Sequence, residues 1–222
     1  MENKIINKEN NLNLFINQLR QYSQELYLLI NPTKKEPKIN ESINYINSII
    51  ENDNEYNEIL IESTYFYLLL HSFSDSFSIE LNKKILKIIK NLTSKNNFQE
   101  ILIEKNLLKI LNILFCQNSL NKEVSEIMIE ILKKNKHKKE IMKIIKENIF
   151  YFPDYQNLSL SFLDLIIQFL DEEELPFEEE IIEWINEISL IEEEEENTLI
   201  KIIEITFKMC KNKDYYLQLS SL

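Results

Sequence analysis

Apolar residues recur every three to four positions along most of this chain, which is the pattern of an amphipathic helix. Leu12, Phe15, Leu19, Tyr22 and Leu26 form the first such series. Strict alternation, the pattern of a half-buried strand, is not the rule, so the sequence predicts an all-α fold. Helices are expected over about 12–29, 39–50, 56–63, 66–70, 79–92, 97–104, 107–116, 121–134, 163–170 and 199–207.

One segment occurs twice. Residues 58–62 read Glu-Ile-Leu-Ile-Glu, and the same five residues return at 100–104, which is 42 positions later. Apolar positions keep the same step, since Ile43, Ile85 and Ile127 are also 42 apart. A fixed period of about 40 residues is typical of an α-solenoid, in which helical units stack on a shared core. The Glu-Ile pair that opens this segment recurs at Glu140 and Glu180.

Residues 88–114 carry the most specific form of this period. A helix ends there in Asn91-Leu92-Thr93, a short helix follows, and a Leu-x-x-Ile-Leu helix begins after Asn106. This order resembles an armadillo repeat, in which Asn-Leu-Ser often ends the third helix and glycine usually stands in place of Asn106. Asparagine tolerates the left-handed backbone of such a turn, and Asn135 and Asn212 fall at similar helix ends. The resemblance implies a right-handed α-solenoid of armadillo/HEAT-like repeats, about four to five units long.

The period places the whole chain, residues 1–222, in a single armadillo-like domain. Residues 1–30 are expected to form an N-terminal capping helix. Residues 31–38 hold Pro32 and Pro37 among lysines and read as a linker, because proline disfavours helix at the residue before it. Repeats would fill 39–211, and 212–222 would be a C-terminal cap or a truncated unit.

The composition excludes several classes of site. The chain contains no glycine, which phosphate-binding loops, dinucleotide fingerprints, EF-hand loops and nucleophile elbows need in their usual forms. His71 and His137 stand apart from cysteine or carboxylate at metal-ligand spacing, and no serine–histidine–aspartate arrangement stands out. We therefore expect no catalytic residue, no metal and no cofactor. Cys116 and Cys210 both lie in apolar helical patterns and read as buried, reduced thiols.

Charge is distributed unevenly. Residues 1–146 carry 21 basic and 18 acidic side chains, whereas residues 147–222 carry 4 and 19, which together give the net charge of −12. Such an acidic end argues against nucleic acid as a partner. No signal peptide and no apolar run of about 20 residues is evident, so we expect a cytoplasmic protein without a transmembrane segment.

The armadillo resemblance implies a concave groove, lined by third helices, that binds an extended peptide or a helix of another protein. Asn91 stands where the family has an asparagine that clamps the partner's backbone. The importin-type pairing of tryptophan with asparagine four residues on is missing, because Ile188 follows Trp184 at that distance. The groove positions expected from the helix pattern are Lys84, Lys87, Asn91, Glu126, Glu130, Lys133, Asp164 and Gln168.

A lysine-rich stretch between two expected helices offers a second surface, for an acidic partner or lipid headgroups. A solvated connection, or one attracted to the acidic end of the same chain, explains it more simply. The leading hypothesis is a non-catalytic scaffold or adaptor, in the manner of cytoskeletal or GTPase-linked modules; whether it self-associates is open. The alternatives are a regulatory or docking domain of an enzyme complex, and a nucleic-acid or membrane-surface binder. The basic patch comprises Lys134, Lys136, Lys138, Lys139 and Lys143, within the stretch Lys133–Lys146.

Overall fold

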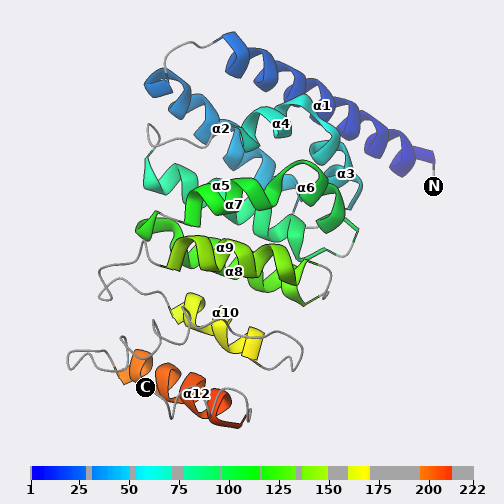
Figure 1. Ribbon diagram of the computed structural model, residues 1–222. Coiled ribbons are helices and arrows are strands. Elements are labelled where there is room, and N and C mark those ends of the chain that lie inside the picture. The colour runs from blue at the N-terminus through cyan, green and yellow to red at the C-terminus, as the bar shows by residue number, and fades with distance from the viewer. Residues whose placement is uncertain are drawn as a thin grey trace. The chain divides into compact units, whose positions relative to one another are not determined.

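The structure is a computed structural model that describes residues 2–28, 32–50, 54–71, 78–95, 97–115, 117–133, 137–149, 160–170 and 196–211. Every regular element in these ranges is a helix, which confirms the all-α prediction for the described part of the chain (Figure 1). The chain forms two compact units, Met1–Ile110 and Leu111–Leu222. Their boundary falls inside helix α7 (Leu107–Phe115).

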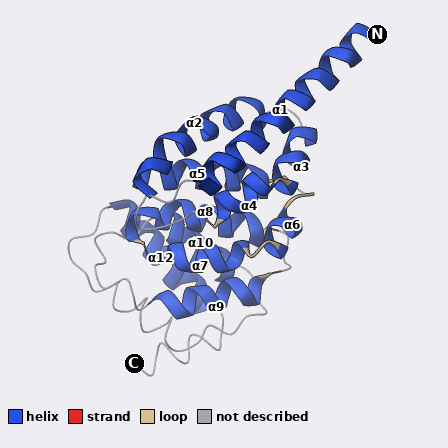
Figure 2. Ribbon diagram, turned by 90° about the horizontal axis from the view of Figure 1, so that it is seen from above, coloured by secondary structure: helices blue, strands red, loops and turns tan. Residues whose placement is uncertain are grey.

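The first unit is organised around its first helix. That helix packs against the three that follow, and the second helix also packs against the fifth. Figure 2 shows that the N-terminal end of the first helix runs past the other helices of this unit. The helices are α1 (Glu2–Leu28), α2 (Pro32–Ile50), α3 (Asn54–Glu62), α4 (Thr64–Leu70), α5 (Ile79–Thr93) and α6 (Gln99–Glu104).

Aromatic rings from four helices meet in the core of the first unit. Phe15 on α1 contacts Tyr45 on α2 and Tyr56 on α3, with ring centroids 6.2 and 5.1 Å apart. Tyr22, two turns further along α1, contacts Tyr45 and Tyr65, with centroids 6.0 and 5.8 Å apart. Offset and edge-on ring pairs stabilise a core beyond the area that they bury. The spacing of Phe15 and Tyr22, seven residues apart, puts both on one face of α1 and so holds that helix on the unit.

The prediction of a linker at 31–38 is wrong, because helix α2 begins at Pro32 and includes Pro37. Proline suits the first position of a helix, where its missing N–H would have no partner. Pro37 removes one backbone hydrogen bond near the start of the helix, at an exposed position. Polar contacts compensate for that loss: Glu36 accepts a hydrogen bond from Ser78, and Lys38 pairs with Glu25 at 3.0 Å.

Helix boundaries follow local chemistry where the sequence supplies it. Ser63 and Ser78 have extended backbones, and their hydroxyl oxygens accept hydrogen bonds from the amides of Phe66 and Leu81 at the starts of α4 and α5. Asn106, between α6 and α7, has a φ of 68°, which confirms the left-handed turn predicted there. The similar turns expected at Asn135 and Asn212 lie outside the described residues.

The repeated five-residue segment occupies equivalent helices. Residues 58–62 end α3 and residues 100–104 end α6, and each of these short helices is followed directly by another. The central leucine of each copy, Leu60 and Leu102, is fully buried. The corresponding Glu140 lies in the longer α9, and Glu180 lies outside the described residues.

In the second unit one helix lies between two others. Helix α10 packs against α8 on one side and α12 on the other. Its Phe162 also contacts Phe115 of α7, with ring centroids 5.4 Å apart. The elements are the 3₁₀ helix η1 (Asn118–Leu120), α8 (Asn121–Leu132), α9 (Lys138–Ile149), α10 (Leu160–Leu170) and α12 (Glu196–Lys211).

Some sequence predictions fall outside these ranges. The residues 212–222, expected as a cap or a truncated unit, and the thiol of Cys116 are not described, nor is the side chain of Cys210 in α12. None of the helices in the described ranges combines the length and the apolar character that a membrane span requires.

Candidate partner-binding surfaces

The predicted groove positions of the first unit lie on one face of α5. Lys84, Lys87 and Asn91 are exposed or half-buried, while the opposite face of the helix is buried in the core. Lys84 donates a 2.6 Å hydrogen bond to Asn40 on α2. Lys87 makes no ion pair and the Asn91 amide no hydrogen bond within the described residues. Two of the three predicted side chains are therefore uncommitted.

Polar contacts fasten α5 to α2 along its length. Ser78, just before α5, bonds Glu36, Lys84 bonds Asn40, and the Lys95 ammonium donates to the carbonyl oxygen of Ile50 at 3.2 Å. The partners in these three pairs are 42, 44 and 45 residues apart, close to the period of the sequence repeat. A cavity of about 430 Å³ opens among the first two pairs, lined by Glu36, Pro37, Asn40, Ser78, Glu80, Leu81 and Lys84.

Asn47 on α2 matches Asn91 on α5. Asn47 follows Asn40 by seven residues, and Asn91 follows Lys84 by seven, so both asparagines occupy the same place relative to the Asn40–Lys84 bond. The side-chain oxygen of Asn47 is buried and has no hydrogen-bond partner among the described residues. A buried acceptor left unbonded costs about 1–3 kcal/mol. The sequence analysis missed Asn47, because it lies 44 residues before Asn91 and so falls outside the 42-residue step that relates Ile43 to Ile85.

In the second unit, most predicted groove residues contact their neighbours. On α8, Glu130 pairs with Lys133 at 2.6 Å, and Glu126 accepts a 3.5 Å hydrogen bond from Ser161 on α10. Asp164 on α10 forms an ion pair with Lys201 on α12. Gln168, half-buried on α10, makes no side-chain hydrogen bond within the described residues. The pairs therefore link α10 to both of its neighbours.

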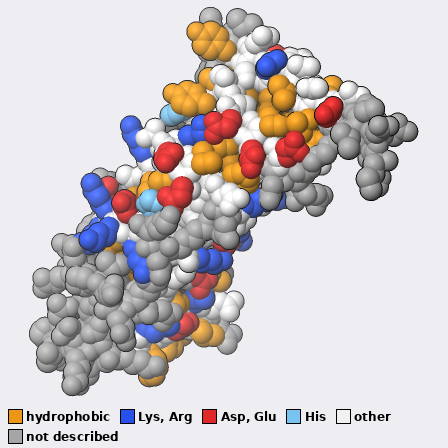
Figure 3. Space-filling model, turned by 90° about the vertical axis from the view of Figure 1, so that its right-hand side faces the viewer, with side chains coloured by type: hydrophobic (Ala, Val, Ile, Leu, Met, Phe, Trp, Pro, Cys, Tyr) orange, Lys and Arg blue, Asp and Glu red, His pale blue; other side chains and the backbone are white. Residues whose placement is uncertain are grey.

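Charges on these faces are mixed. In the first unit the face holds Glu36 and Glu80 beside Lys84 and Lys87. On the face of the molecule that Figure 3 shows, acidic, basic and apolar side chains of the described residues lie interspersed. Exposed ion pairs contribute little energy, and the mixed signs give these described faces no dominant charge.

The expected basic patch is only partly described. Lys134 and Lys136 lie outside the described residues, while Lys138, Lys139 and Lys143 lie on α9. Lys139 and Lys143 are exposed, and Lys143 is 3.6 Å from Glu147 one turn later. Lysine and carboxylate thus alternate on this helix, as on an ordinary solvated surface.

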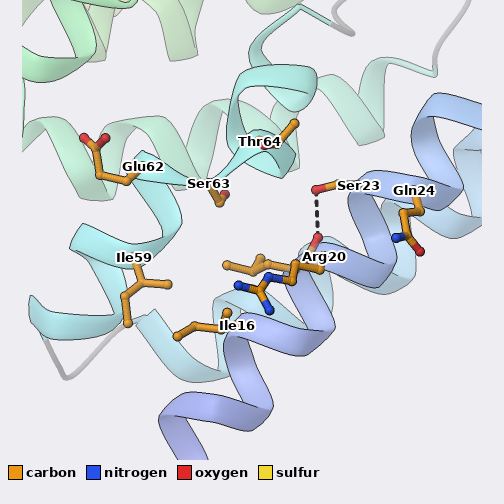
Figure 4. Close-up of a pocket in the computed structure, with 9 residues that line it drawn as sticks. Ile16, Arg20, Ser23, Gln24, Ile59, Glu62, Ser63 and Thr64 are labelled. Atoms are coloured by element: carbon orange, nitrogen blue, oxygen red, sulfur yellow. Dashed lines mark hydrogen bonds between the residues drawn. The ribbon is translucent and has the colours of Figure 1, made fainter.

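A cavity that the sequence did not reveal lies between α1 and the junction of α3 with α4. Its volume is about 550 Å³, and Ile16, Leu19 and Ile59 supply the apolar wall. Figure 4 shows the Arg20 side chain beside Ile16, with the Ser23 hydroxyl bonded to the Leu19 carbonyl at 2.8 Å. The remaining lining residues are Gln24, Glu62, Ser63 and Thr64.

Arg20 is the chain's only arginine. That rarity was the one feature of the sequence that could have drawn attention to this cavity. The Arg20 guanidinium group makes no ion pair within the described residues. Ser63 is already used, because its hydroxyl donates to Leu60 and accepts from Phe66. Among the described residues, the polar lining groups without a side-chain hydrogen bond or ion pair are Arg20, Gln24, Glu62 and Thr64.

The two histidines lie at helix boundaries. His71 follows α4, where its ring contacts that of Tyr67 with centroids 4.4 Å apart, and His137 precedes α9. In the described ranges, no three histidine, cysteine, aspartate or glutamate side chains converge as metal ligands would.

No protein-family model matches the chain, and no curated protein sequence matches it.

Proposed function

We propose that the protein is a non-catalytic interaction module with armadillo-like helical repeats, and that it binds an extended peptide of another protein across α2 and α5. The observation that carries this proposal is the equivalence of Asn47 and Asn91. Two half-buried amides at the same place on neighbouring helices suit the N–H and C=O groups of an extended backbone.

The contacts around these asparagines support the proposal. Glu36–Ser78, Asn40–Lys84 and Ile50–Lys95 hold α2 and α5 side by side, so a ligand need not order them. Binding to a preorganised surface loses less conformational entropy. Lys87, exposed and uncommitted, would add a charged contact to a carboxylate of the peptide. A cytoplasmic adaptor is the role we propose for such a module.

The test starts from peptides selected on the purified protein from a random display library. Their affinities are then measured for the wild type and for Asn47→Ala, Asn91→Ala and the double variant. We expect the double variant to lose at least about tenfold in affinity, because two hydrogen bonds to the backbone disappear. Asn97→Ala, an exposed asparagine between α5 and α6, serves as the matched control.

N-methylation of single backbone amides in the best peptide separates backbone recognition from side-chain recognition. One or two methylated positions should abolish binding to the wild type while leaving residual binding to the double alanine variant unchanged. Peptides that bind equally well to all variants, or that protect α9 rather than α2 and α5 from hydrogen exchange, would refute the proposal.

A further inference from the structure

The cavity between α1 and the junction of α3 with α4 belongs to the first unit and shares no residue with the proposed peptide site. Its volume of about 550 Å³ falls within the roughly 300–1,000 Å³ of small-molecule sites. Ile16 on α1 and Ile59 on α3 face each other across it, and both are half-buried (Figure 4). Leu19, which is 2% exposed, completes an apolar wall. The space is therefore suited to a hydrocarbon group.

Two hydroxyl groups in the lining are already used by the protein itself. Ser23 donates a hydrogen bond to the Leu19 carbonyl oxygen at 2.8 Å. Ser63 donates to the carbonyl oxygen of Leu60 at 2.6 Å and accepts from the amide of Phe66, where it begins α4. Because these bonds hold the helices, the charged groups of the lining decide which polar end a ligand carries.

Arg20 gives the cavity a positive charge beside its apolar wall. It follows Ile16 by four residues and so lies on the same face of α1. Figure 4 shows its guanidinium group beside Ile16, whereas the carboxylate of Glu62 points away from Arg20. Arg20 makes no ion pair within the described residues. A guanidinium group is weakly hydrated and presents its donors in a planar fork that matches the two oxygens of a carboxylate.

We propose that this cavity binds an aliphatic monocarboxylate, a small acid with a flexible hydrocarbon chain. Arg20 binds the carboxylate through paired hydrogen bonds. Gln24, one turn later on the same face of α1, donates its side-chain amide to one of the same oxygens. The hydrocarbon chain lies between Ile16 and Ile59, where its burial supplies most of the affinity.

Glu62 determines which acids the cavity accepts. It is exposed in the lining and makes no ion pair within the described residues. A second carboxylate at the other end of the ligand would meet either this like charge or the apolar wall, and both raise its free energy. Decanoate should therefore bind at least about tenfold more tightly than decanedioate, which has the same length and a carboxylate at each end.

NMR spectroscopy tests the contact with Arg20 directly. Because Arg20 is the chain's only arginine, its Nε–H group gives a single resonance that needs no assignment. Titration of the full chain with decanoate, kept below the concentration at which it forms micelles, should shift this resonance and saturate. Octanoate should bind more weakly, by up to about fourfold for each methylene group removed. Decanol and decyltrimethylammonium lack the carboxylate and should bind at least about tenfold more weakly.

Three variants, measured by isothermal titration calorimetry with decanoate, test the assignment of charges. Arg20→Met keeps an apolar stem but removes the donors, and should weaken binding at least about tenfold. Lys109→Met on α7 makes the same change of charge at an exposed position outside the cavity and should leave binding unchanged. Glu62→Gln should leave decanoate binding at least as tight and should strengthen decanedioate binding. Since all three side chains are exposed or half-buried at most, circular dichroism and melting temperature should match the wild type.

Several outcomes would overturn the proposal. Decanoate could leave the Arg20 resonance unmoved, or it could bind Arg20→Met as tightly as the wild type. Weaker binding of decanoate to Glu62→Gln would show that the cavity selects a cationic group instead. A short peptide ending in leucine that shifts the resonance where decanoate does not would assign the cavity to a protein partner. Asn47→Ala and Asn91→Ala should bind decanoate normally, so this test and that of the peptide site fail separately.

Discussion

The ammonium group of Lys95 donates a 3.2 Å hydrogen bond to the backbone carbonyl oxygen of Ile50, which is the last residue of α2. The last carbonyls of a helix lack partners within it, and a lysine there also meets the negative end of the helix dipole. In this protein the lysine comes from just after the end of the next long helix, α5, and not from α2 itself. The contact therefore ends one helix and attaches its neighbour at the same time.

Replacing Lys95 tests this double role. Lys95→Met keeps most of the aliphatic stem but removes the donor and the charge, and should lower the free energy of unfolding by about 1 kcal/mol. Urea denaturation followed by circular dichroism measures the change. Lys87→Met on α5 is the control, because Lys87 is exposed and makes no ion pair within the described residues. If both variants lower the free energy of unfolding equally, the Lys95 contact does not stabilise α2.

A second prediction concerns the buried hydrogen bond between the hydroxyls of Ser42 on α2 and Tyr65 on α4. Ser42 also donates to the Ile39 carbonyl at 2.8 Å, so it keeps a partner when Tyr65 becomes phenylalanine. Ser42→Ala instead leaves the tyrosine hydroxyl buried and unbonded. We expect Ser42→Ala to cost about 1–3 kcal/mol and Tyr65→Phe about 1 kcal/mol.

The double variant completes a thermodynamic cycle for this pair. Ser42→Ala combined with Tyr65→Phe should cost clearly less than the sum of the single changes, because no hydroxyl is then left without a partner. Additive costs, measured by chemical denaturation, would show that the two hydroxyls do not interact.

The buried tyrosines also predict how stability depends on alkaline pH. Burial raises the pKa of Tyr65 above its ordinary value of 10.0, and burial raises the pKa of Tyr22 in the same direction. The folded state thus holds these protons after the unfolded chain has begun to lose them. Their contribution is complete below about pH 10 and falls as pH rises further, by up to about 1.4 kcal/mol per pH unit for each group.

Denaturation at a series of pH values between neutral and strongly alkaline measures this fall. Tyr65→Phe should make the decline shallower, because one of the titrating groups is removed. Tyr27→Phe is the matched control, since Tyr27 is 78% exposed. Lysine deprotonation affects the wild type and both variants alike, so a slope that Tyr65→Phe leaves unchanged would contradict the assignment.

The turn at Asn106 allows a prediction from backbone conformation alone. With φ at 68°, this residue is in the left-handed region, which glycine enters freely and residues with a β-carbon enter at a cost. Asn106→Gly should therefore leave stability nearly unchanged, whereas Asn106→Ala should lower it by about 1 kcal/mol. Asn97→Gly and Asn97→Ala, at an exposed position before α6, provide the comparison by thermal denaturation. An alanine tolerated as well as glycine at 106 would contradict the geometry.

Helix positions were predictable because burial imposes a period on the sequence. The spacing of Phe15, Leu19 and Tyr22 predicts α1, and the apolar positions from Ile79 to Leu92 predict α5. The left-handed turn at Asn106 could be recognised because the chain contains no glycine, the residue that usually adopts this backbone conformation. In each case the information lies within a few residues of the feature.

The first turns of α2 could not be predicted in this way. Pro32 and Pro37 argue locally for a linker, and the contacts that stabilise helix there come from Glu25 and Ser78, which are distant in sequence. The candidate binding site could not be fully predicted for the same reason, namely that its contacts join residues distant in sequence. Lys84 could be placed on a surface from its helix pattern, but its bond to Asn40 depends on how α2 and α5 pack.

The aromatic cluster determines where the chain can be modified. Phe15 is the first core residue of α1 in the described range, and the side chains at positions 9–14 before it are mostly exposed. Affinity handles or fluorescent labels placed ahead of that point leave the rings of Tyr45, Tyr56 and Tyr65 covered. Shortening the chain beyond it would remove the ring that packs on Tyr45 and Tyr56, so any expression fragment should retain Phe15.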